Sequence, residues 1–418
     1  MKVWIFQSGE PLHIDKGNAR PMRAMNLANA LVEKDHNVVI WSSSFYHQKK
    51  LKRFKLYRKI VINKKLEIRL IPSPGYKKNI SIQRLFDHFM FAYNLKKKLD
   101  IEKNSPDVAF VGYPPIETAF IMTSWLKKKK IPYLLDIKDQ WPLIFIESSP
   151  KILQPLIKLI LLPYFFVAKK TFKESPAICT MSKNFLDWSL KFSNRKKNKF
   201  DIVAPLTSPD YKLKNLEEKH AYSWWLKKGV MQNNIFRVIF IGSFSRAFDF
   251  DLIFNVANYF LEKNINCEFV LCGDGEFKKY LKKKSQNFSN IKIIDWIDLP
   301  KAITLSSMSS AFIAPYKNKD DFMKSIPNKV VDAIKFGIPL LSSLKGEVES
   351  LIKKNEIGFI YYNEKSLINI IDVLLNNVNL HRKISNNCKK IYKEKFKFNK
   401  IYNELIQNLE NLKKIDNN

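Results

Sequence analysis

Residues 327–343 read "PNKVVDAIKFGIPLLSS", which predicts a short helix over 328–336 followed by an apolar strand. Pro327 suits the start of a helix, and Gly337 suits the residue after the last turn. Asp332 interrupts the apolar face of this helix. Because a carboxylate among core residues needs a partner or a ligand, the segment predicts a helix that holds a polar group.

Apolar, β-branched runs alternate with helical patterns along the whole chain, which is typical of parallel α/β domains. In the first half we expect strands over 3–7, 37–42, 66–72, 108–113, 132–137 and 177–182. In the second half we expect strands over 237–243, 267–273, 291–297, 311–316 and 339–343. The predicted fold class is α/β, with two Rossmann-like, doubly wound parallel-sheet domains facing a central cleft. In such sheets, ligands bind at the carboxyl ends of the strands.

A polar, turn-rich segment over 206–235 separates these two series of strands. We therefore expect a first domain over 1–205, a linker region over 206–235 and a second domain over 236–395. The last residues, 396–418, predict a C-terminal helix that packs back on the first domain.

Positive charge dominates the chain, and most of it lies in the first half. The 418 residues carry a net charge of +33. Residues 1–200 contain 38 Lys and Arg and 15 Asp and Glu, a net charge of +23, whereas the remainder carries +10. Three interpretations stay open: a lysine-rich composition without a special partner, nucleic-acid binding, and a basic face on anionic lipid. Because the sequence contains no recognised nucleic-acid module, we favour an anionic membrane surface and expect no nucleic acid.

Cysteine usage and hydropathy predict where the protein works. The four cysteines have neither metal spacing nor the pattern of a disulfide framework, which suits a reducing cytoplasm. The N-terminus has no signal-peptide core, and no uncharged apolar run is long enough to span a bilayer. The nearest run is 152–168, "ILQPLIKLILLPYFFVA", which Lys158 and two prolines interrupt. It predicts either a buried core helix or an apolar hairpin that dips into the membrane interface. We expect a cytoplasmic protein, peripheral on the inner face of the cell membrane.

Glycines and arginines follow several of the predicted strands. After the first strand, a long loop reaches Gly17 and a helix opens near Arg20, which would let the backbone approach a phosphate. In the second half, "GSFSR" follows the first strand, with Gly242 at its start and Arg246 at its end. Arginine suits a pyrophosphate because it is always charged and binds oxygens in pairs. Gly273 opens "GDGEF" after the next strand and permits a close turn.

A further signal follows the fifth strand, where residues 136–142 read "DIKDQWP". We expect Asp139 to point into the cleft. Asp136 is expected to cap a helix or to pair with Lys138 or Arg23.

Two other stretches of the second half are assigned more simply. Ile297 ends the third predicted strand of this half, and its backbone is expected to face a nucleobase. The "DFD" at 249–251 resembles a metal-binding Asp-x-Asp, but it opens a predicted helix, where acids cap and favour the dipole. We therefore expect no metal.

The order of these motifs resembles the retaining glycosyltransferases of family 4, which have the GT-B fold, and the resemblance covers nearly the whole chain. "DIKDQWP" is similar to the "D-x-R-D-x-WP" of a bacterial subgroup that builds surface polysaccharides such as lipopolysaccharide. Residues 327–343 resemble the family's "P-x-K-x-x-E-x-x-x-x-G-x-P-V-x-x", and "GDGEF" resembles its "G-x-G".

The resemblance implies that the first domain binds the acceptor and the second binds the nucleotide sugar. It implies that Asp332 binds the ribose and that the helix start near 325–329 faces the diphosphate and the sugar. The chain departs from the family at two points. Lys324 stands eight positions before Asp332, where a family glutamate would touch the donor sugar. The usual Arg and Lys after the first strand of the second domain are also missing, which leaves Arg246 as the candidate cation.

These observations predict a glycosyltransferase of the hexosyltransferase type. It would move a sugar from a UDP-sugar to a lipid-linked or polysaccharide acceptor with retention, without a metal or other cofactor. Charge on the departing diphosphate would be met by cationic side chains and helix-end amides. Asp139 is the predicted catalytic residue, which accepts a proton from a sugar hydroxyl or orients it. The predicted donor-binding residues are Gly17, Arg20, Gly242, Arg246, Gly273, Ile297, Lys324, Asn328, Lys329 and Asp332.

Two alternatives stay open. A sugar-nucleotide epimerase also uses two such domains, but it needs no membrane face, so the charge of +23 on residues 1–200 argues against it. A non-catalytic glycan-binding relative would explain Lys324 and the missing Arg and Lys.

Overall fold

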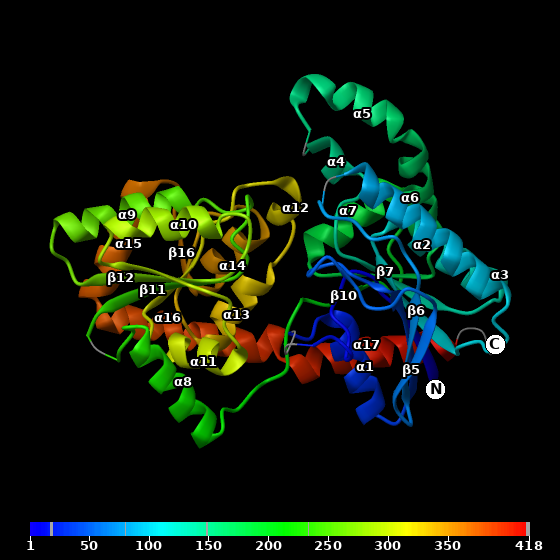
Figure 1. Cartoon of the computed structure of the whole chain (residues 1–418), viewed down its shortest axis with the longest axis horizontal. Coiled ribbons are helices and arrows are strands. Elements are labelled where there is room, and N and C mark those ends of the chain that lie inside the picture. Colours follow the sequence, from blue (N-terminus) through cyan, green and yellow to red (C-terminus); the bar gives the residue numbers. More distant parts are fainter. Residues whose placement is uncertain (17–19, 80, 148, 233, 415–418) are drawn as a thin grey trace. The chain divides into compact units, whose positions relative to one another are not determined.

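The computed structural model describes residues 1–16, 20–79, 81–147, 149–232 and 234–414. The chain forms two compact units (Figure 1). Unit 1 comprises Met1–Pro209 and Phe398–Asn418, and unit 2 comprises Asp210–Lys397.

Unit 1 is built on an eight-stranded sheet with the strand order β10-β9-β8-β7-β1-β2-β6-β5. Its strands are β1 (Lys2–Phe6), β2 (Asn37–Ser43), β5 (Arg58–Asn63), β6 (Leu66–Ile71), β7 (Val108–Tyr113), β8 (Tyr133–Ile137), β9 (Ala177–Thr180) and β10 (Ile202–Val203). Neighbours pair in parallel except β5, which forms an antiparallel hairpin with β6. The strands β3 (Phe45–Tyr46) and β4 (Leu51–Lys52) form a separate antiparallel pair.

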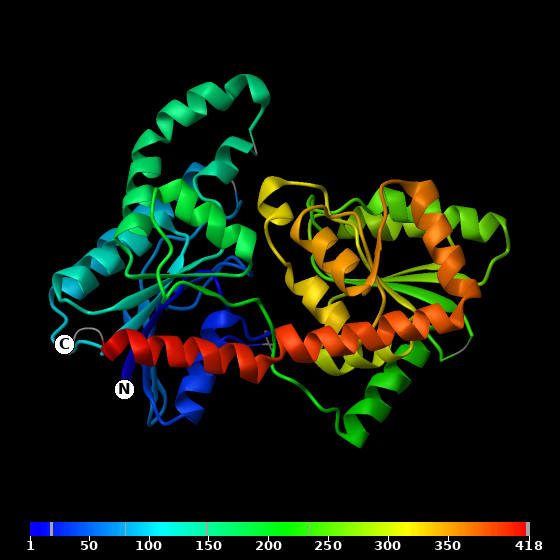
Figure 2. The same ribbon diagram turned by 180° about the vertical axis from the view of Figure 1, so that it is seen from behind.

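Helices cover both faces of this sheet, as its continuously apolar central strands require. On one face, α1 (Arg23–Glu33) and α17 (Phe398–Lys413) complete an apolar core with the strands. On the other face the core contains residues of α2 (Ile82–Asp100), α3 (Ile116–Lys128), α6 (Leu162–Glu174) and α7 (Lys183–Ser193). Figure 2 shows α17, in red, as the last helix of unit 1. It buries seven side chains at helical spacing, so the C-terminal residues are part of the core of this unit.

Unit 2 contains a six-stranded, fully parallel sheet with the order β13-β12-β11-β14-β15-β16. Its strands are β11 (Phe236–Ile241), β12 (Cys267–Cys272), β13 (Ile291–Ile294), β14 (Ala311–Ala314), β15 (Leu340–Ser342) and β16 (Gly358–Ile360). Its helices are α8 (Asn215–Lys227), α9 (Phe250–Glu262), α10 (Lys278–Lys284), α11 (Leu299–Ser307), α12 (Asp320–Met323), α13 (Asn328–Phe336), α14 (Glu347–Asn355), α15 (Glu364–Asn376) and α16 (Val378–Ile391).

Both sheets are doubly wound, as predicted. In unit 1 the chain moves outward from β1 to β2 and β6, then returns to β7 on the other side of β1. In unit 2 it moves from β11 to β12 and β13, then returns to β14 beside β11. Each sheet therefore has a point at which the winding reverses, and the crevice outside the strand ends at such a point is where ligands bind.

The segment predicted as a linker, 206–235, is only partly irregular. It contains α8, whose Trp225 is fully buried and donates its indole N–H to the backbone oxygen of Lys301 at 2.9 Å. Ala221 and Trp225, four positions apart, face the core of unit 2. The segment therefore contains a helix that belongs to the fold of unit 2, and the described residues on either side of it are irregular.

Candidate functional site

Gly242 follows β11 at the reversal point of the unit 2 sheet. Its φ of 159° lies in a region that favours glycine, and a Cβ at this position would lie 2.0 Å from Cε of Lys329. The amide of Gly242 donates to the carbonyl oxygen of Cys272 at 2.9 Å. The side chain of Lys329 therefore lies directly against the backbone at the end of β11.

Two further glycines bring the ends of β11 and β12 close together. A Cβ at Gly273 would lie 1.8 Å from the carbonyl oxygen of Gly242. Gly275 has a φ of 147°, and a Cβ there would lie 2.5 Å from the carbonyl oxygen of Phe244. Backbone thus packs on backbone at these strand ends, which explains why "GDGEF" has glycine at both positions.

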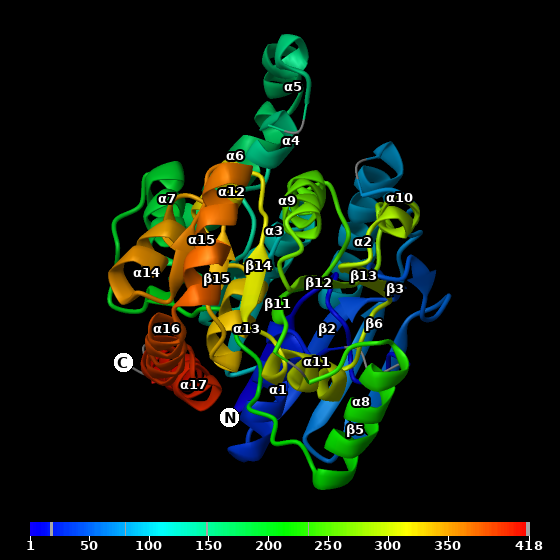
Figure 3. The same ribbon diagram turned by 90° about the vertical axis from the view of Figure 1, so that its left-hand side faces the viewer.

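Lys329 lies in the first turn of α13, which is located beside β14 (Figure 3). Its ammonium lies 4.7 Å from the ring centroid of Phe248 and 5.5 Å from that of Phe240. Contacts of this kind attract a cation to the face of an aromatic ring. The ring of Phe248 in turn packs 4.7 Å from Tyr316. The aromatic side chains therefore hold the Lys329 cation at the carboxyl ends of β11 and β14.

Asp332 lies three residues after Lys329 on α13 and is half-buried. Tyr316, two residues after β14, is close enough that burial and the Asp332 charge raise the pKa of its phenol. The acid that interrupts the apolar helix thus faces the same strand end as Lys329. A helix start, a cation and an acid in this order can hold a diphosphate and a ribose.

The remaining residues near α13 lie around this centre. Asn328 is the first residue of α13, and Gly337 ends the helix with a φ of 69°. Lys324, which follows the short helix α12, pairs its ammonium with the carboxylate of Asp320. The cation that stands eight positions before Asp332 is therefore paired with a neighbouring acid.

Arg246 follows β11, and Ile297 follows β13. The Arg246 side chain is 81% exposed and lies 3.3 Å from the carboxylate of Glu276. The Ile297 side chain is buried, while its neighbour Trp296 is 61% exposed. Arg246 therefore lies on the surface, paired with Glu276, and Ile297 presents its backbone rather than its side chain.

The "DFD" motif has the capping role that the sequence predicts. The Asp249 carboxylate accepts the backbone N–H of Leu252 at 3.3 Å and begins α9. Asp251 accepts from the ammonium of Lys284 at 2.5 Å. Among the residues that the structure describes, no group of three His, Cys, Asp or Glu could hold a metal ion.

Unit 1 contains the site residues that were predicted in the first half of the chain. Gly17 lies outside the described residues, and Arg20 is exposed. Asp136 is fully buried and pairs with both partners proposed for it, at 3.5 Å from Arg23 and 3.4 Å from Lys138.

These contacts belong to a buried charge network with two acids and two cations. Glu10, which the sequence reasoning missed, accepts the backbone N–H of Ala24 at 2.8 Å and pairs with Lys138. Arg23 also donates to the carbonyl oxygen of Ala204 at 2.6 Å. Burial lowers the pKa of Lys138, but the charges of Glu10 and Asp136 outweigh it and raise that pKa above its ordinary value. The network joins β1, α1 and β8 at the strand ends of unit 1.

Asp139 follows β8 and is half-buried. Burial raises the pKa of its carboxyl, against the opposing charges of Lys138 and Arg84. A carboxylate with a raised pKa is suited to accept a proton. The guanidinium of Arg84 also lies 4.8 Å from the ring of Trp141, and its Nε lies 3.4 Å from His88. Arg84 and His88 come from α2, and the sequence contains no motif that would have indicated them.

Two surface hollows of unit 2 lie elsewhere. One is lined by Lys354, Asn387 and Lys390, and the other by Asn234, Asn266 and Ser310. Neither lining contains a residue of the predicted site. We therefore locate the candidate site at the carboxyl ends of the strands and not in these hollows.

Comparison with known proteins first defines the fold class. The chain is similar to a sucrose-phosphate synthase from Thermosynechococcus elongatus (13% identity, 98% of both chains, TM-score 0.72). It is also similar to WaaG, a glycosyltransferase involved in lipopolysaccharide biosynthesis (11% identity, 98% of this chain and 99% of that one, TM-score 0.66). HepE from Anabaena in complex with UDP-glucose matches as well (13% identity, 98% and 100%, TM-score 0.63). The predicted GT-B fold of two Rossmann-like domains is confirmed.

A comparison with family models finds a match for one part of the chain. Residues 226–391, which make up most of unit 2, match the family described as "Glycosyl transferases group 1". This match includes Gly242, Gly273 and the whole of α13. A search of curated proteins gives no match.

The buried network makes a prediction about stability. Arg23→Met leaves the carboxylate of Asp136 with Lys138 as its remaining ion pair. Breaking a buried pair in this way costs about 3–5 kcal/mol. We expect a loss of this size in the free energy of unfolding, measured by urea denaturation.

The control is Arg58→Met, because Arg58 is exposed on the edge strand β5. The free energy of unfolding of this variant should lie within about 0.5 kcal/mol of the wild-type value. Equal losses for the two variants would contradict a structural role for the network.

Proposed function

We propose that this chain transfers a glycosyl group from a UDP-sugar to a lipid-linked or polysaccharide acceptor in cell-surface glycan synthesis. The transfer proceeds with retention and without a metal. The observation that carries this proposal is the position of Lys329 and Asp332 on α13, inside the segment that matches the glycosyl transferase group 1 family and at the strand ends marked by Gly242. The HepE structure contains UDP-glucose, which supports a UDP-sugar as the donor.

Unit 2 supplies the donor site in this proposal. Breaking the bond between nucleotide and sugar leaves negative charge on the diphosphate, and Lys329 with the first amides of α13 would stabilise it. Asp332 would accept hydrogen bonds from the ribose hydroxyls. Arg246 would approach the diphosphate only by leaving Glu276. We therefore propose that Lys329 contributes more than Arg246 to stabilising the charge on the diphosphate.

Unit 1 supplies the acceptor site. Asp139 accepts a proton from the acceptor hydroxyl or orients it, and its raised pKa favours that role. The net charge of +23 on residues 1–200 favours an acceptor held at an anionic membrane, on the cytoplasmic face.

The first experiment tests the reaction itself. The purified chain is incubated with a panel of nucleotide sugars and a membrane extract, and release of nucleoside diphosphate is measured. Release that requires both a sugar donor and the extract supports transfer. Interconversion of the nucleotide sugar without an acceptor would identify an epimerase, and binding of glycan without release would identify a non-catalytic relative.

Donor binding tests the roles of α13. Lys329→Met removes a charge-assisted contact, and contacts of this kind contribute about 1.5–3 kcal/mol. We therefore expect the Kd for the UDP-sugar to rise about 10- to 100-fold in calorimetry. Asp332→Asn should have a similar effect, while Asp332→Glu should keep much of the affinity, because the related family has glutamate at this position.

The matched control is Lys335→Met, at the other end of α13, where the ammonium lies 3.6 Å from Asp210. It should leave the Kd unchanged. If Lys329→Met, Lys335→Met and the wild type all bound the UDP-sugar with the same Kd, this placement of the diphosphate would be refuted.

The acceptor side is tested by Asp139→Asn. A proton acceptor contributes about 10²–10⁴-fold to the rate, so kcat should fall by that range while donor affinity is retained. The carboxyl must be ionised to act, and its pKa is raised. The wild-type rate should therefore decline on acidification at a higher pH than an ordinary carboxyl, with a pKa of about 3.9, would give. A variant that keeps wild-type kcat would remove Asp139 from the mechanism.

A further inference from the structure

The segment that the sequence left open between a buried helix and an apolar hairpin is a hairpin on the surface of unit 1. It consists of the 3₁₀ turn Lys151–Leu153, α5 (Gln154–Ile160) and the start of α6. We call these residues, 151–166, the apolar hairpin. Every residue of α5 is exposed or half-exposed. Figures 1 and 3 show α4 (Leu143–Glu147) and α5 standing away from the sheet of unit 1.

Large apolar side chains cover this hairpin. The exposed ones are Ile152 at 88%, Leu153 at 46%, Leu156 at 55%, Leu159 at 63%, Ile160 at 64%, Leu162 at 51% and Phe166 at 69%. A contiguous apolar surface of this kind marks an interaction site.

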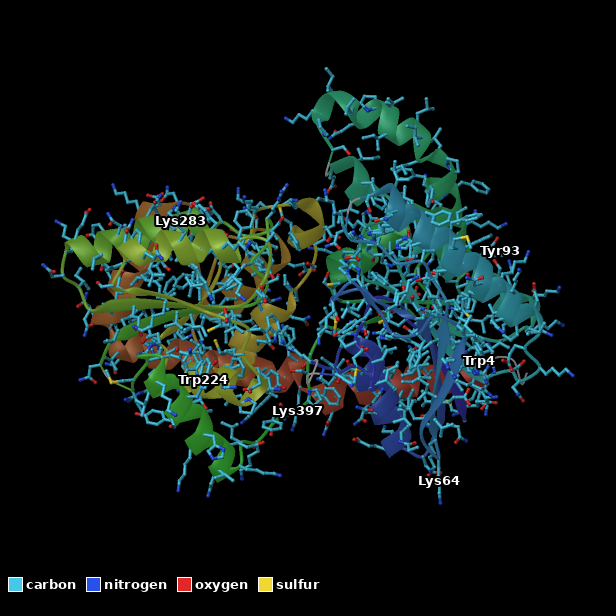
Figure 4. The ribbon with its side chains drawn as sticks, in the orientation of Figure 1. Trp4, Lys64, Tyr93, Trp224, Lys283 and Lys397 are labelled. Atoms are coloured by element: carbon cyan, nitrogen blue, oxygen red, sulfur yellow. The ribbon has the colours of Figure 1, made fainter. Side chains whose placement is uncertain are left out.

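A second apolar stripe lies on α2, in the helix layer that contains α6. Ile82, Phe86, Phe89 and Tyr93 are 47–85% exposed and follow one another at steps of four, three and four residues. Figure 4 labels Tyr93 on the outer side of α2. Both α2 and α6 pack against α3, so the two stripes belong to one layer.

The charges around the hairpin are almost all positive. Residues 149–174 contain Lys151, Lys158, Lys169, Lys170 and Lys173 but a single acid, Glu174. A partner for this surface must offer apolar depth and negative charge together. A second copy of the chain would place lysines against lysines, whereas an anionic bilayer offers acyl chains beneath its phosphates.

The geometry of the hairpin suits insertion at the membrane interface better than a straight crossing of the bilayer. Among the described residues no single helix is long and apolar enough to span a membrane. Lys151–Ile160 and Leu162–Glu174 reach that length only together, and they are bent by 64°. The seven residues of α5 rise about 10 Å, against about 30 Å of hydrocarbon.

We propose that the apolar hairpin is an interfacial anchor, which inserts its leucine and isoleucine side chains below the headgroups of an anionic lipid bilayer. Its lysines contact the lipid phosphates, and their apolar stems lie along the surface. The α2 stripe lies in the helix layer from which this anchor extends. The anchor rests on the surface of unit 1 and not on the glycosyl transfer proposed above, so each can fail alone.

A series of side-chain contacts connects the base of the anchor to the proposed acceptor side of unit 1. Tyr164 on α6 donates its hydroxyl to the carboxylate of Glu117 at 2.9 Å, and Glu117 lies 3.9 Å from His88. His88 packs 5.5 Å from Trp141, two residues after Asp139. If the proposed function holds, a lipid-linked acceptor would reach Asp139 while its lipid stays in the bilayer.

Vesicle flotation of the full chain tests the anchor. We expect binding to vesicles of equal parts zwitterionic and anionic phospholipid, and weaker binding to purely zwitterionic vesicles. The variant Ile152→Ser/Leu159→Ser changes two exposed side chains, so it should fold normally. Since each fully buried aliphatic side chain accounts for about tenfold or more in partitioning, vesicle affinity should fall about 100-fold.

The matched control is Leu216→Ser/Val378→Ser, two side chains in unit 2 that are 64% and 67% exposed. It should bind vesicles like the wild type. Equal binding by both double variants, or no binding by the wild type at low salt, would overturn the proposal. A dimer that the Ile152→Ser/Leu159→Ser variant abolishes, without vesicle binding, would assign the hairpin to self-association instead.

The depth of the hairpin in the bilayer is measured with a fluorophore attached to the cysteine of the Leu156→Cys variant. This cysteine reacts selectively because the four natural cysteines are buried. Quenchers near the headgroups should quench it more than quenchers at the centre of the bilayer. The same label at Leu216→Cys should show neither effect. Stronger quenching from the centre would contradict interfacial insertion.

Discussion

The contact between the Lys329 side chain and the backbone of Gly242 is the constraint on which the proposed site depends. It requires a residue without Cβ at the end of β11, and it requires α13 to begin beside that strand end. The second requirement is met by the packing of Val330, Val331, Ala333 and Ile334 in the core of unit 2. Apolar burial therefore positions the helix, and the helix positions a cation and an acid on its remaining face.

The strand ends of unit 1 are joined by a different kind of interaction. Buried charges, rather than glycines, join β1, α1 and β8, and the Asp136 carboxylate lies between the cations of Arg23 and Lys138. Asp139 follows directly and has a raised pKa. The same stretch of sequence therefore provides one acid that supports the fold and one that is suited to chemistry. The hairpin beyond it contributes little to the core, because most of its large apolar side chains are exposed.

Much of the fold could be predicted because central strands of parallel sheets are continuous apolar runs, as in Val108–Tyr113. Short or exposed strands such as β5, β10 and β16 lack that signal and were missed. The helix α8 was missed because only Ala221 and Trp225 face the core. In the site, Lys329 and Asp332 share one helix and could be recognised by spacing. Tyr316, Glu10 and Arg84 come together with their partners only through tertiary packing. Apolar content alone also cannot distinguish a buried helix from the exposed apolar hairpin.

The most direct measurement is a crystal structure of the full chain with UDP. We expect a phosphate oxygen within hydrogen-bond distance of Nζ of Lys329, and the ribose hydroxyls in contact with the carboxylate of Asp332. UDP bound away from α13, with its phosphates on Arg246 and its ribose clear of Asp332, would contradict this donor site.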